Sequence, residues 1–306
     1  MKVFVTGATG FVGTQIVRQL RAGDHSIRLL VRRRSQAQGL QATGRVELHE
    51  GDVTQPDSLR GALAGVDAVI HLVGIISECG QSTFENVHVE GTRNILAAAV
   101  SSGVSRFVHM SALGTRPNAR SRYHQTKWKA EEGVRRSGLR FTIFRPSLIF
   151  GPGDHFVNLF AKIARFSPFL PVIGNGQSRF APVSVDTVAM AFARSLTTPE
   201  AIGGTFDLCG PQNVTFDELL DEILRALNRR RMKLHVPLWL ARAQASVLEW
   251  VYPRLLGRAP PLNRDQILML EEDNVGDCSP AEKLFELPRV PLQEGIRACL
   301  AQRQWV

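Results

Sequence analysis

A tyrosine and a lysine four residues apart, Tyr123 and Lys127, are the pair in this sequence best placed to do chemistry. In a helix they lie one turn apart on the same face. The chain holds only two tyrosines and six lysines, so a chance Tyr-x-x-x-Lys is expected in about one such chain in twenty-five. A neighbouring ammonium lowers the pKa of a phenol toward the working range, so the pair indicates general acid–base catalysis. The plain alternative is a surface helix with an aromatic residue near its start.

A serine, Ser111, follows the apolar run 107–110, which is typical of a strand. In a parallel sheet it would lie at the carboxyl edge, where ligands of such folds bind. A hydroxyl there can hydrogen-bond a reacting oxygen, and the alternative is a strand-end serine that caps a turn. With Tyr123 and Lys127 near it in the chain, we place Ser111 in the same site. No group of cysteine and histidine has metal-ligand spacing, so no metal is expected.

Three glycines at a spacing of three, Gly7, Gly10 and Gly13, lie between a strand-like run at 3–5 and a helical pattern. Strand, glycine-rich turn and helix is the context of a dinucleotide-binding fingerprint. The first glycine permits the tight turn, the second lets the backbone approach a pyrophosphate, and the third lets the helix pack on the sheet. The helix then offers free N–H groups and a positive dipole end to the phosphates. A tight turn that carries glycines for packing alone remains the alternative.

Short apolar runs alternate with helical patterns through the first half of the chain. This alternation predicts an α/β fold in which a doubly wound parallel sheet is covered by helices on both faces. The expected strands are 3–5, 27–31, 46–48, 68–72, 107–110 and 141–144, and the expected helices are 13–22, 56–64, 87–102 and 123–137.

The pattern changes after residue 146, which divides the chain into two predicted parts. Residues 1–146 form the dinucleotide-binding domain, to which the segment of about 183–209 returns with a helix (183–196) and a strand (204–208). Residues 147–182 and 210–306 form a smaller, mostly helical C-terminal lobe that binds a substrate or a partner.

The composition indicates a globular protein with a basic surface. The net charge is +9, carried by 31 arginines and 6 lysines. No nucleic-acid-binding motif accompanies this charge, so nucleic acid is not an expected partner. The four cysteines are scattered and are interpreted as reduced thiols, and the first strand begins at the N-terminus. We therefore expect a cytoplasmic protein with no signal peptide and no membrane-spanning segment.

The glycine motif, Ser111 and Tyr123-x-x-x-Lys127 together resemble the short-chain dehydrogenase/reductase superfamily. The stretches 71–74, 86–92, 145–147 and 151–153 resemble its extended and atypical branches, which include the NAD-dependent epimerase/dehydratases. The stretches 123–158, 183–189 and 265–267 are similar to one atypical group, that of the nucleotide-binding accessory subunit of respiratory complex I and related ubiquinone-biosynthesis proteins. The resemblance covers nearly the whole chain and implies a Rossmann-type fold.

The resemblance also implies a role for each matching residue. Tyr123 would be the acid or base, Lys127 would bind the nicotinamide ribose and tune Tyr123, and Ser111 would orient the carbonyl. Asp52 and Val53 would receive the adenine. The other implied cofactor contacts are Gly7, Thr9, Gly10, Phe11, Val12 and Gly13 at the phosphates, Leu72, Val73 and Gly74 along the cofactor, and Pro146, Ser147 and Leu148 at the nicotinamide.

The end of the second strand departs from an NAD-binding pattern. An acidic residue usually stands there to bind the ribose hydroxyls. Here Arg32, Arg33 and Arg34 follow the strand, and guanidinium groups suit a 2′-phosphate better than a hydroxyl pair. We therefore expect NADP(H) as the preferred cofactor, with NAD(H) as the alternative. The three arginines could also be an exposed basic turn that binds no cofactor.

The C-terminal lobe carries a second candidate feature. Arginines at 229–231 precede a largely apolar stretch that contains Trp239, Trp250 and Tyr252. Such a stretch can be lobe core, a pocket for a lipophilic substrate, or a peripheral contact with the inner face of a membrane or a protein complex.

Two functions of different classes follow. One is an NADP(H)-dependent oxidoreductase that acts on a carbonyl or alcohol, with a lipophilic or quinone-related small molecule as the substrate. The other is a non-catalytic dinucleotide-binding subunit or assembly factor, and sugar-nucleotide epimerisation or dehydration is a weaker third. The intact Ser111, Tyr123 and Lys127 favour the first.

Overall fold

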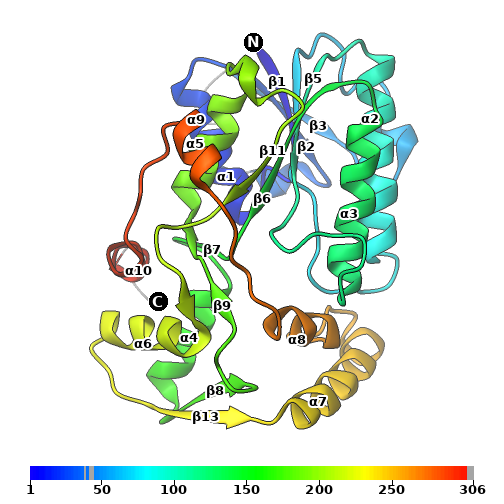
Figure 1. Ribbon diagram of the computed structural model, residues 1–306. Coiled ribbons are helices and arrows are strands. Elements are labelled where there is room, and N and C mark those ends of the chain that lie inside the picture. The colour runs from blue at the N-terminus through cyan, green and yellow to red at the C-terminus, as the bar shows by residue number, and fades with distance from the viewer. Residues whose placement is uncertain (38, 41–44, 302–306) are drawn as a thin grey trace.

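The computed structural model describes residues 1–37, 39–40 and 45–301 of the chain. Seven strands form one parallel sheet in the spatial order β3-β2-β1-β4-β5-β6-β11 (Figure 1). The strands are β1 (Lys2–Thr6), β2 (Ser26–Val31), β3 (Val46–Glu50), β4 (Ala68–His71), β5 (Arg106–Met110), β6 (Arg140–Pro146) and β11 (Thr205–Leu208). Every strand expected in the Rossmann-type fold is present, and the α/β fold class is confirmed.

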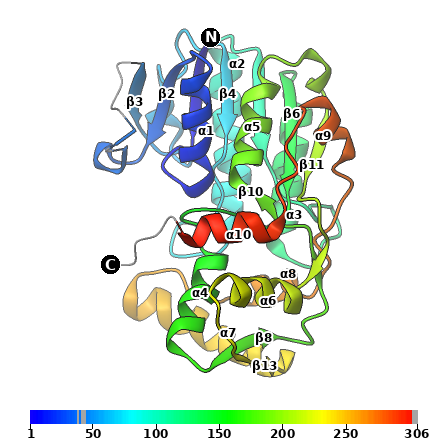
Figure 2. The same ribbon diagram turned by 90° about the vertical axis from the view of Figure 1, so that its left-hand side faces the viewer.

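Helices cover both faces of this sheet (Figures 1 and 2). One core lies under α1 (Phe11–Ala22) and α5 (Val185–Ser195). The other lies under α2 (Gly91–Ser101) and α3 (Arg122–Arg135). The central strands β1, β4 and β5 are buried at nearly every position because successive side chains alternate between these two cores, whereas the edge strand β3 has no fully buried residue.

The strand order reverses between β1 and β4, which pair side by side although two strands separate them in sequence. Such a switch point opens a crevice at the carboxyl ends of the strands, where ligands of doubly wound sheets bind. The glycine turn after β1 and the ends of β4, β5 and β6 all meet this edge.

A smaller lobe lies beyond the carboxyl edge, away from the N-terminus (Figure 2). Its own apolar core contains Phe150, Val157, Phe216 and Leu220. The remaining elements of the chain are η1 (Arg34–Ala37), η2 (Pro56–Leu59), η3 (Glu85–Glu90), β7 (Ile149–Phe150), α4 (Phe156–Phe166), β8 (Phe169–Ile173), β9 (Arg179–Phe180), β10 (Val183–Ser184), η4 (Pro199–Ala201), β12 (Val214–Thr215), α6 (Phe216–Ala226), β13 (Met232–Val236), α7 (Leu238–Val251), η5 (Tyr252–Leu256), α8 (Arg264–Leu270), α9 (Ser279–Leu284) and α10 (Leu292–Ala301).

The structure differs from the expected elements at three places. The helix expected at 56–64 is a single 3-10 turn, η2, followed by turns at Gly61 and Gly65, both with positive φ. The helix expected at 87–102 begins as the π-helical η3. The segment after residue 210 is less purely helical than expected, because β13 pairs in parallel with β8.

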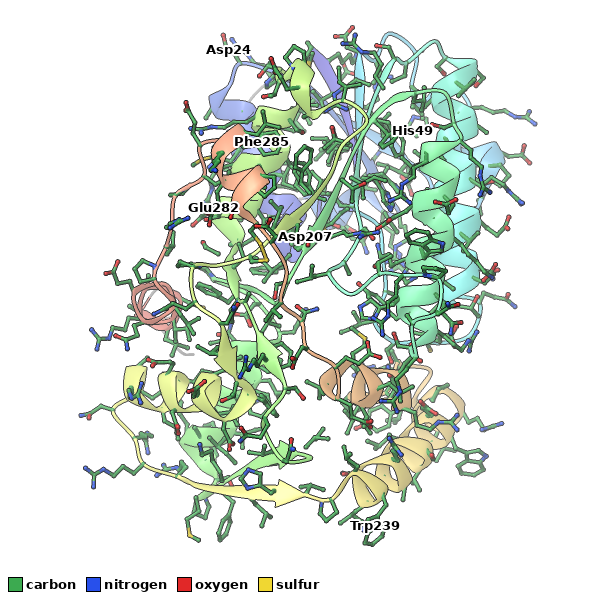
Figure 3. The ribbon with its side chains drawn as sticks, viewed as in Figure 1. Asp24, His49, Asp207, Trp239, Glu282 and Phe285 are labelled. Carbon is green, nitrogen blue, oxygen red and sulfur yellow. A yellow bond between two sulfur atoms is a disulfide. The ribbon has the colours of Figure 1, made fainter. Side chains whose placement is uncertain are left out.

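Two further differences concern the last third of the chain. Phe285 and Leu287 pack into the core under α1 and α5, so this segment lies on the main sheet and not in the lobe (Figure 3). Cys209 and Cys278 form a disulfide, so the expectation of reduced thiols is wrong for this pair. The two cysteines are 69 residues apart, and only the return of the chain to β11 brings them together. Within the described residues, no helix is both long and apolar enough to span a bilayer.

Candidate active site

The turn after β1 leaves no room for side chains at two of its three glycines. Gly7 has φ +73°, a conformation that L residues rarely adopt. A Cβ on Gly13 would lie 2.2 Å from the carbonyl oxygen of Gly7, so only glycine lets α1 approach the strand. A Cβ on Gly10 would meet only that same oxygen, at 3.3 Å. Packing therefore restricts Gly10 less than Gly13, as expected if the bare backbone at Gly10 serves the approach of a pyrophosphate.

The N-terminus of α1 is prepared for an anion. Its N-cap, Gly10, provides no side-chain cap, and its first turn contains no acidic residue. Phe11 is half-buried and lies beside the loop after β7, where a Cβ on Gly151 would be 3.5 Å from the ring. Thr9 is exposed and Val12 is buried. The uncapped N–H groups and the missing Cβ atoms fit a pyrophosphate, as the dinucleotide fingerprint predicts.

Within residues 1–37, 39–40 and 45–301, the two arginines that follow β2 have no carboxylate partner. Arg32 and Arg33 are exposed, and among the described residues neither makes an ion pair or a side-chain hydrogen bond. Arg34 differs, since its Nε lies 3.8 Å from a carboxylate oxygen of Glu50. Two unpaired guanidinium groups therefore lie at the strand end where the adenosine ribose of a dinucleotide would bind.

The loop after β3 is organised by the carboxylate of Asp52. Its Oδ1 accepts hydrogen bonds from the backbone N–H and the hydroxyl of Thr54, at 2.9 and 2.8 Å. The side chain of Val53 is buried against the core of the α2 face. One carboxylate oxygen of Asp52 thus holds the loop through Thr54.

The Lys127 ammonium lies where α3, β4 and β5 meet. Its Nζ donates to the carbonyl of Met110, the residue before Ser111, at 2.9 Å. On the β4 side, a Cβ on Gly74 would lie 3.0 Å from the same Nζ. Burial lowers the pKa of Lys127 to about 8, and the nearby carboxylate of Glu131 offsets part of that effect.

Tyr123 lies one turn before Lys127 and is surrounded by rings. Its ring is 5.4 Å from His88 and 6.0 Å from Phe84, in edge-on contacts with both. Burial raises the pKa of Tyr123 to about 12. The expected lowering by Lys127 is therefore absent from the protein alone, and the phenol is firmly protonated at neutral pH.

The two serines expected in the site are both buried. Ser111 donates to the hydroxyl of Thr115 at 3.3 Å, a weak bond that a substrate oxygen could replace. Ser147 is fixed more firmly, because its Oγ lies 2.6 Å from the side-chain oxygen of Asn274 and 2.9 Å from that residue's carbonyl. Ser147 is thus tied to the C-terminal part of the chain.

The other expected cofactor contacts end neighbouring strands. Leu72, Val73 and Gly74 follow β4, with Leu72 buried and Gly74 exposed. Pro146 ends β6 and is buried, and Leu148 packs partly against the lobe core. The structure brings all of these residues to the carboxyl edge of the sheet, with Arg32 and Asp52 at the neighbouring ends of β2 and β3.

A layer of buried histidines below Lys127 was not anticipated from the sequence. His88 Nε2 lies 3.0 Å from the backbone N and 3.1 Å from the carbonyl oxygen of Ile75, and Nδ1 lies 2.9 Å from Thr126 Oγ1. Burial and the Lys127 charge lower the pKa of His88, and they lower that of His71 to about 3. His71 bonds Thr6 and Thr92 across the sheet, at 2.7 and 3.1 Å.

His109, stacked on His71 at 5.5 Å, is the exception in this layer. Both of its ring nitrogens are buried without a partner. Burial and the Lys127 charge hold the pKa of His109 well below its ordinary value. The histidines are therefore neutral, and they surround Lys127 with polar but uncharged groups. The sequence signal for them was the placement of His71 and His109 at the ends of apolar runs, where a buried polar side chain needs an explanation.

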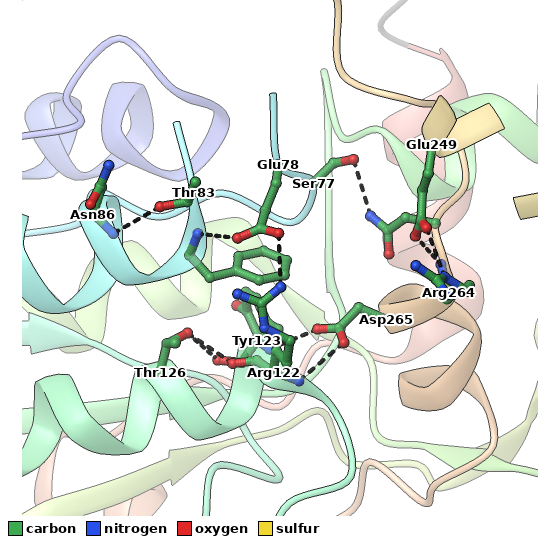
Figure 4. A network of polar contacts seen from close by, with 12 residues as sticks. Ser77, Glu78, Thr83, Asn86, Arg122, Tyr123, Thr126, Glu249, Arg264 and Asp265 are labelled. Atoms are coloured by element: carbon green, nitrogen blue, oxygen red, sulfur yellow. Dashed lines mark hydrogen bonds and ion pairs between the residues drawn. The ribbon is translucent and has the colours of Figure 1, made fainter. Parts of the chain in front are cut away.

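Asp265 connects the lobe to α3, the helix that carries Tyr123 and Lys127. Its two carboxylate oxygens accept the backbone N–H groups of Arg122 and Tyr123, at 3.0 and 2.7 Å (Figure 4). A carboxylate at a helix N-terminus is stabilised both by these hydrogen bonds and by the helix dipole. Asp265 thus fixes the first turn of α3, from which Tyr123 projects. The only sequence signal for Asp265 was that the stretch 265–267 resembles known proteins.

The lobe also holds the loop after β4 by hydrogen bonds. Asn263, the N-cap of α8, donates to the carbonyl of Ile76 at 2.8 Å and lies 3.0 Å from Ser77 Oγ. Arg122 pairs with Glu78 at 3.1 Å, and Glu78 also accepts the N–H of Phe84 (Figure 4). The lobe therefore contacts both the helix of Tyr123 and the loop beside Gly74. In the part of the chain that the structure describes, no cluster of three or more His, Cys, Asp or Glu could hold a metal ion.

Comparisons with known proteins identify the family to which the chain is related. A family described as NAD(P)H-binding matches residues 7–155. Subunit 9 of the NADH dehydrogenase [ubiquinone] 1 alpha subcomplex from Mus musculus is 31% identical over 84% of this chain and 67% of its own length. The 40 kDa subunit of NADH-ubiquinone oxidoreductase from Neurospora crassa is 29% identical over 80% of this chain. The match covers 65% of that relative, so the chain spans just under two thirds of its length.

Other relatives are named as reductases. A 2-alkyl-3-oxoalkanoate reductase from Stenotrophomonas maltophilia is 28% identical over 97% of this chain and 98% of its own. A ceramide reductase from Caulobacter vibrioides is 35% identical over 64% of this chain and 61% of its own. Among solved structures, a dTDP-glucose 4,6-dehydratase from Streptomyces venezuelae with NAD bound superposes with a TM-score of 0.76 and 23% identity, over 100% of this chain and 98% of that one.

The fold is therefore that of the epimerase/dehydratase-like proteins, and the cofactor these matches support is a nicotinamide dinucleotide. The alignment with the mouse subunit extends beyond the nucleotide-binding half and into the lobe. The chain belongs to the NAD(P)-binding, short-chain dehydrogenase/reductase-like family that includes the complex I subunit 9 proteins and related reductases.

Proposed function

We propose that the protein is an NADP(H)-dependent reductase of a lipophilic ketone. The observation that carries the proposal is the protonated phenol of Tyr123, held one turn from a buried lysine at the carboxyl edge of the sheet. Bound NADPH would supply a hydride from the nicotinamide C4 to the carbonyl carbon. The oxygen then needs one proton, and the products are an alcohol and NADP⁺.

Tyr123 supplies that proton from Oη. Its pKa of about 12 keeps it in the acid form throughout the neutral range, which suits reduction better than oxidation. The Lys127 ammonium lies one turn away and stabilises the phenolate as the proton leaves. The Ser111 hydroxyl can exchange its weak bond to Thr115 for one to the substrate oxygen.

The preference for NADP(H) rests on Arg32 and Arg33. Their guanidinium groups are exposed and free of carboxylates among the described residues, so a 2′-phosphate would meet them without displacing an ion pair. NAD(H) remains usable, because the glycine turn and Asp52 contact parts that both cofactors share.

The substrate class is proposed from the named reductases. One relative is named for a 2-alkyl-3-oxoalkanoate and another for ceramide, and both names describe molecules with alkyl chains. The test is NADPH oxidation by the purified chain against 2-alkyl-3-oxoalkanoates, ceramide-related ketones and a short-chain quinone. Conversion of UDP-glucose consumes no NADPH, so its products are measured by chromatography.

Tyr123→Phe keeps the ring contacts and removes the proton, so it should lower kcat at least ~10²-fold while the Kd for NADPH stays within about twofold. Wild-type turnover by Tyr123→Phe would refute the acid role. Turnover of UDP-glucose alone would favour the sugar-nucleotide alternative.

A second candidate is a dinucleotide-binding subunit without turnover. The relatives named as subunits of NADH dehydrogenase favour it. A tightly held dinucleotide in the purified protein, together with no turnover of any ketone, would support this function over the reductase.

A further inference from the structure

The lower end of the lobe exposes large apolar side chains from several separate elements. Phe166 at the end of α4 is 84% exposed, Met232 in β13 is 70% exposed, and Trp239 in α7 is 70% exposed. The end of α4, β13 and α7 lie together at the end of the molecule farthest from the N-terminus in both views (Figures 1 and 2), and Trp239 points outward there (Figure 3). The other exposed apolar residues of this surface, the lobe tip, are Phe169, Leu234, Leu240, Val247, Trp250, Leu255 and Leu256.

Helix α7 buries small side chains and exposes large apolar ones, which is the reverse of an ordinary amphipathic surface helix. Its buried residues are the small Ala241 and Ala245, which pack against Ile267. Trp239, Val247 and Trp250 follow a spacing of eight and three, which places them on one outward face. A soluble surface helix would put its tryptophans inside. This face is therefore built to be covered by something that the chain itself does not supply.

The lobe tip carries an excess of basic residues, of which Lys233 is paired with Asp221 at 3.1 Å and Arg242 with Glu271 at 2.5 Å. Residues 229–258 contain seven basic residues and one acidic residue, Glu249. Glu249 is already paired with Arg264 at 2.7 Å. Within the described part of the chain, Arg229, Arg230 and Arg258 have no carboxylate within ion-pair distance. The apolar face is thus interspersed with cationic groups of one sign.

We propose that the lobe tip binds the surface of an anionic phospholipid membrane. Tryptophan, leucine and phenylalanine at the acyl boundary, with arginines at the phosphates, is the composition of an interfacial element. A second copy of the chain would bring the same positive charge against itself, so self-association through this surface is disfavoured. The proposal does not depend on the reductase function.

The lobe tip is also connected to the candidate site. Beyond η5 the chain runs directly to Pro260 and Asn263, which bond Ser77 and the carbonyl of Ile76 in the loop after β4. A membrane at the lobe tip would therefore lie at the end of the segment that borders the site, where a lipophilic substrate dissolved in the bilayer could arrive.

The test is sedimentation of the full chain with vesicles of phosphatidylcholine, alone or mixed with phosphatidylglycerol. The wild-type protein should bind the mixed vesicles at least tenfold more tightly, and added salt should weaken that binding. The double variant Trp239→Ser, Trp250→Ser should lose at least tenfold in vesicle affinity, and Arg230→Glu should lose several-fold. Both changes are on exposed side chains, so the melting temperature should stay close to that of the wild type.

Matched controls lie on the other part of the molecule. Val100→Ser removes an apolar side chain that is 53% exposed on α2, and Arg18→Glu reverses an exposed charge on α1, so neither should change vesicle affinity. Equal binding by the wild type and the double tryptophan variant would overturn the proposal. It would also fail if the wild type ignored anionic vesicles, or if it formed a dimer that the tryptophan changes dissociate.

Discussion

Replacing Lys127, the buried lysine of the site, by methionine should make the free energy of unfolding less dependent on pH. In the unfolded chain Lys127 has a pKa near 10.5, and burial lowers it to about 8 in the fold. A pKa lowered from 10.5 to about 8 corresponds to about 3 kcal/mol, so charged Lys127 costs about that much stability below pH 8. Lys127→Met removes this cost but leaves the Met110 carbonyl without its donor, a loss of about 1–3 kcal/mol.

The pH window follows from the sign of the shift. Between about pH 8 and 10.5 the unfolded chain keeps the lysine proton that the folded chain has lost, so the free energy of unfolding of the wild type rises with pH. The methionine variant lacks this contribution. From about pH 7 to 9.5, the wild type should therefore gain about 2 kcal/mol relative to Lys127→Met.

Urea unfolding of both proteins across this range measures the difference, because all other titrating groups are shared. Lys129→Met is the control, since Lys129 is exposed on the same helix and paired with Glu85 at 3.0 Å. A constant difference between the wild type and Lys127→Met would refute the idea that burial suppresses the lysine charge. In either case Lys127→Met should lose ketone reduction, so the residue that weakens the fold is the one that the chemistry requires.

Three further changes test the cofactor site and its support. Arg32→Ala should weaken NADPH binding about tenfold and leave NADH unchanged, because only the 2′-phosphate contact is lost, and titration calorimetry will show whether the two cofactors differ at all. Gly10→Val should fold and fail to bind either dinucleotide. Gly13→Val should melt at a much lower temperature, since its Cβ would lie 2.2 Å from a carbonyl oxygen. Equal melting temperatures and equal dinucleotide binding of the two variants would contradict these separate roles. Asp265→Ala removes two hydrogen-bond acceptors from the first turn of α3 and should lower the free energy of unfolding by about 1–2 kcal/mol. It should lower kcat more than it changes the Kd for NADPH. An unchanged kcat would show that Tyr123 needs no such support.

The sheet could be predicted from the sequence because its strands are determined locally. The run 3–5 is apolar at every position, and the runs 27–31 and 68–72 are each apolar except for one residue, Arg28 or His71, as expected of strands buried on both faces. The prediction of a helix at 56–64 was wrong for a local reason. Leu59 and Leu63 are apolar at helical spacing, but Gly61 adopts a positive φ, and a glycine in a periodic pattern does not reveal which conformation it takes.

The chemistry of the site could be predicted only where it follows chain spacing. Tyr123 and Lys127 are four residues apart, so a helix alone brings them together. The disulfide of Cys209 and Cys278, and the bonds from Asp265 to α3, join residues separated by 69 and more than 140 positions. Such contacts depend on how the last third of the chain returns over the sheet, which no local pattern specifies.

The electrostatics of Tyr123 required the structure for the same reason. The sequence places a lysine beside the phenol and predicts a lowered pKa, but burial acts on both groups and shifts them toward their neutral forms, the lysine downward and the tyrosine upward. The protein alone therefore holds a proton donor next to a partly suppressed cation, among histidines that are also kept neutral. The positive charge of an oxidised nicotinamide would be the strongest charge in such a place. In the proposed reductase, the positive charge that appears on the nicotinamide as the hydride leaves would favour release of the Tyr123 proton, beside the Lys127 ammonium.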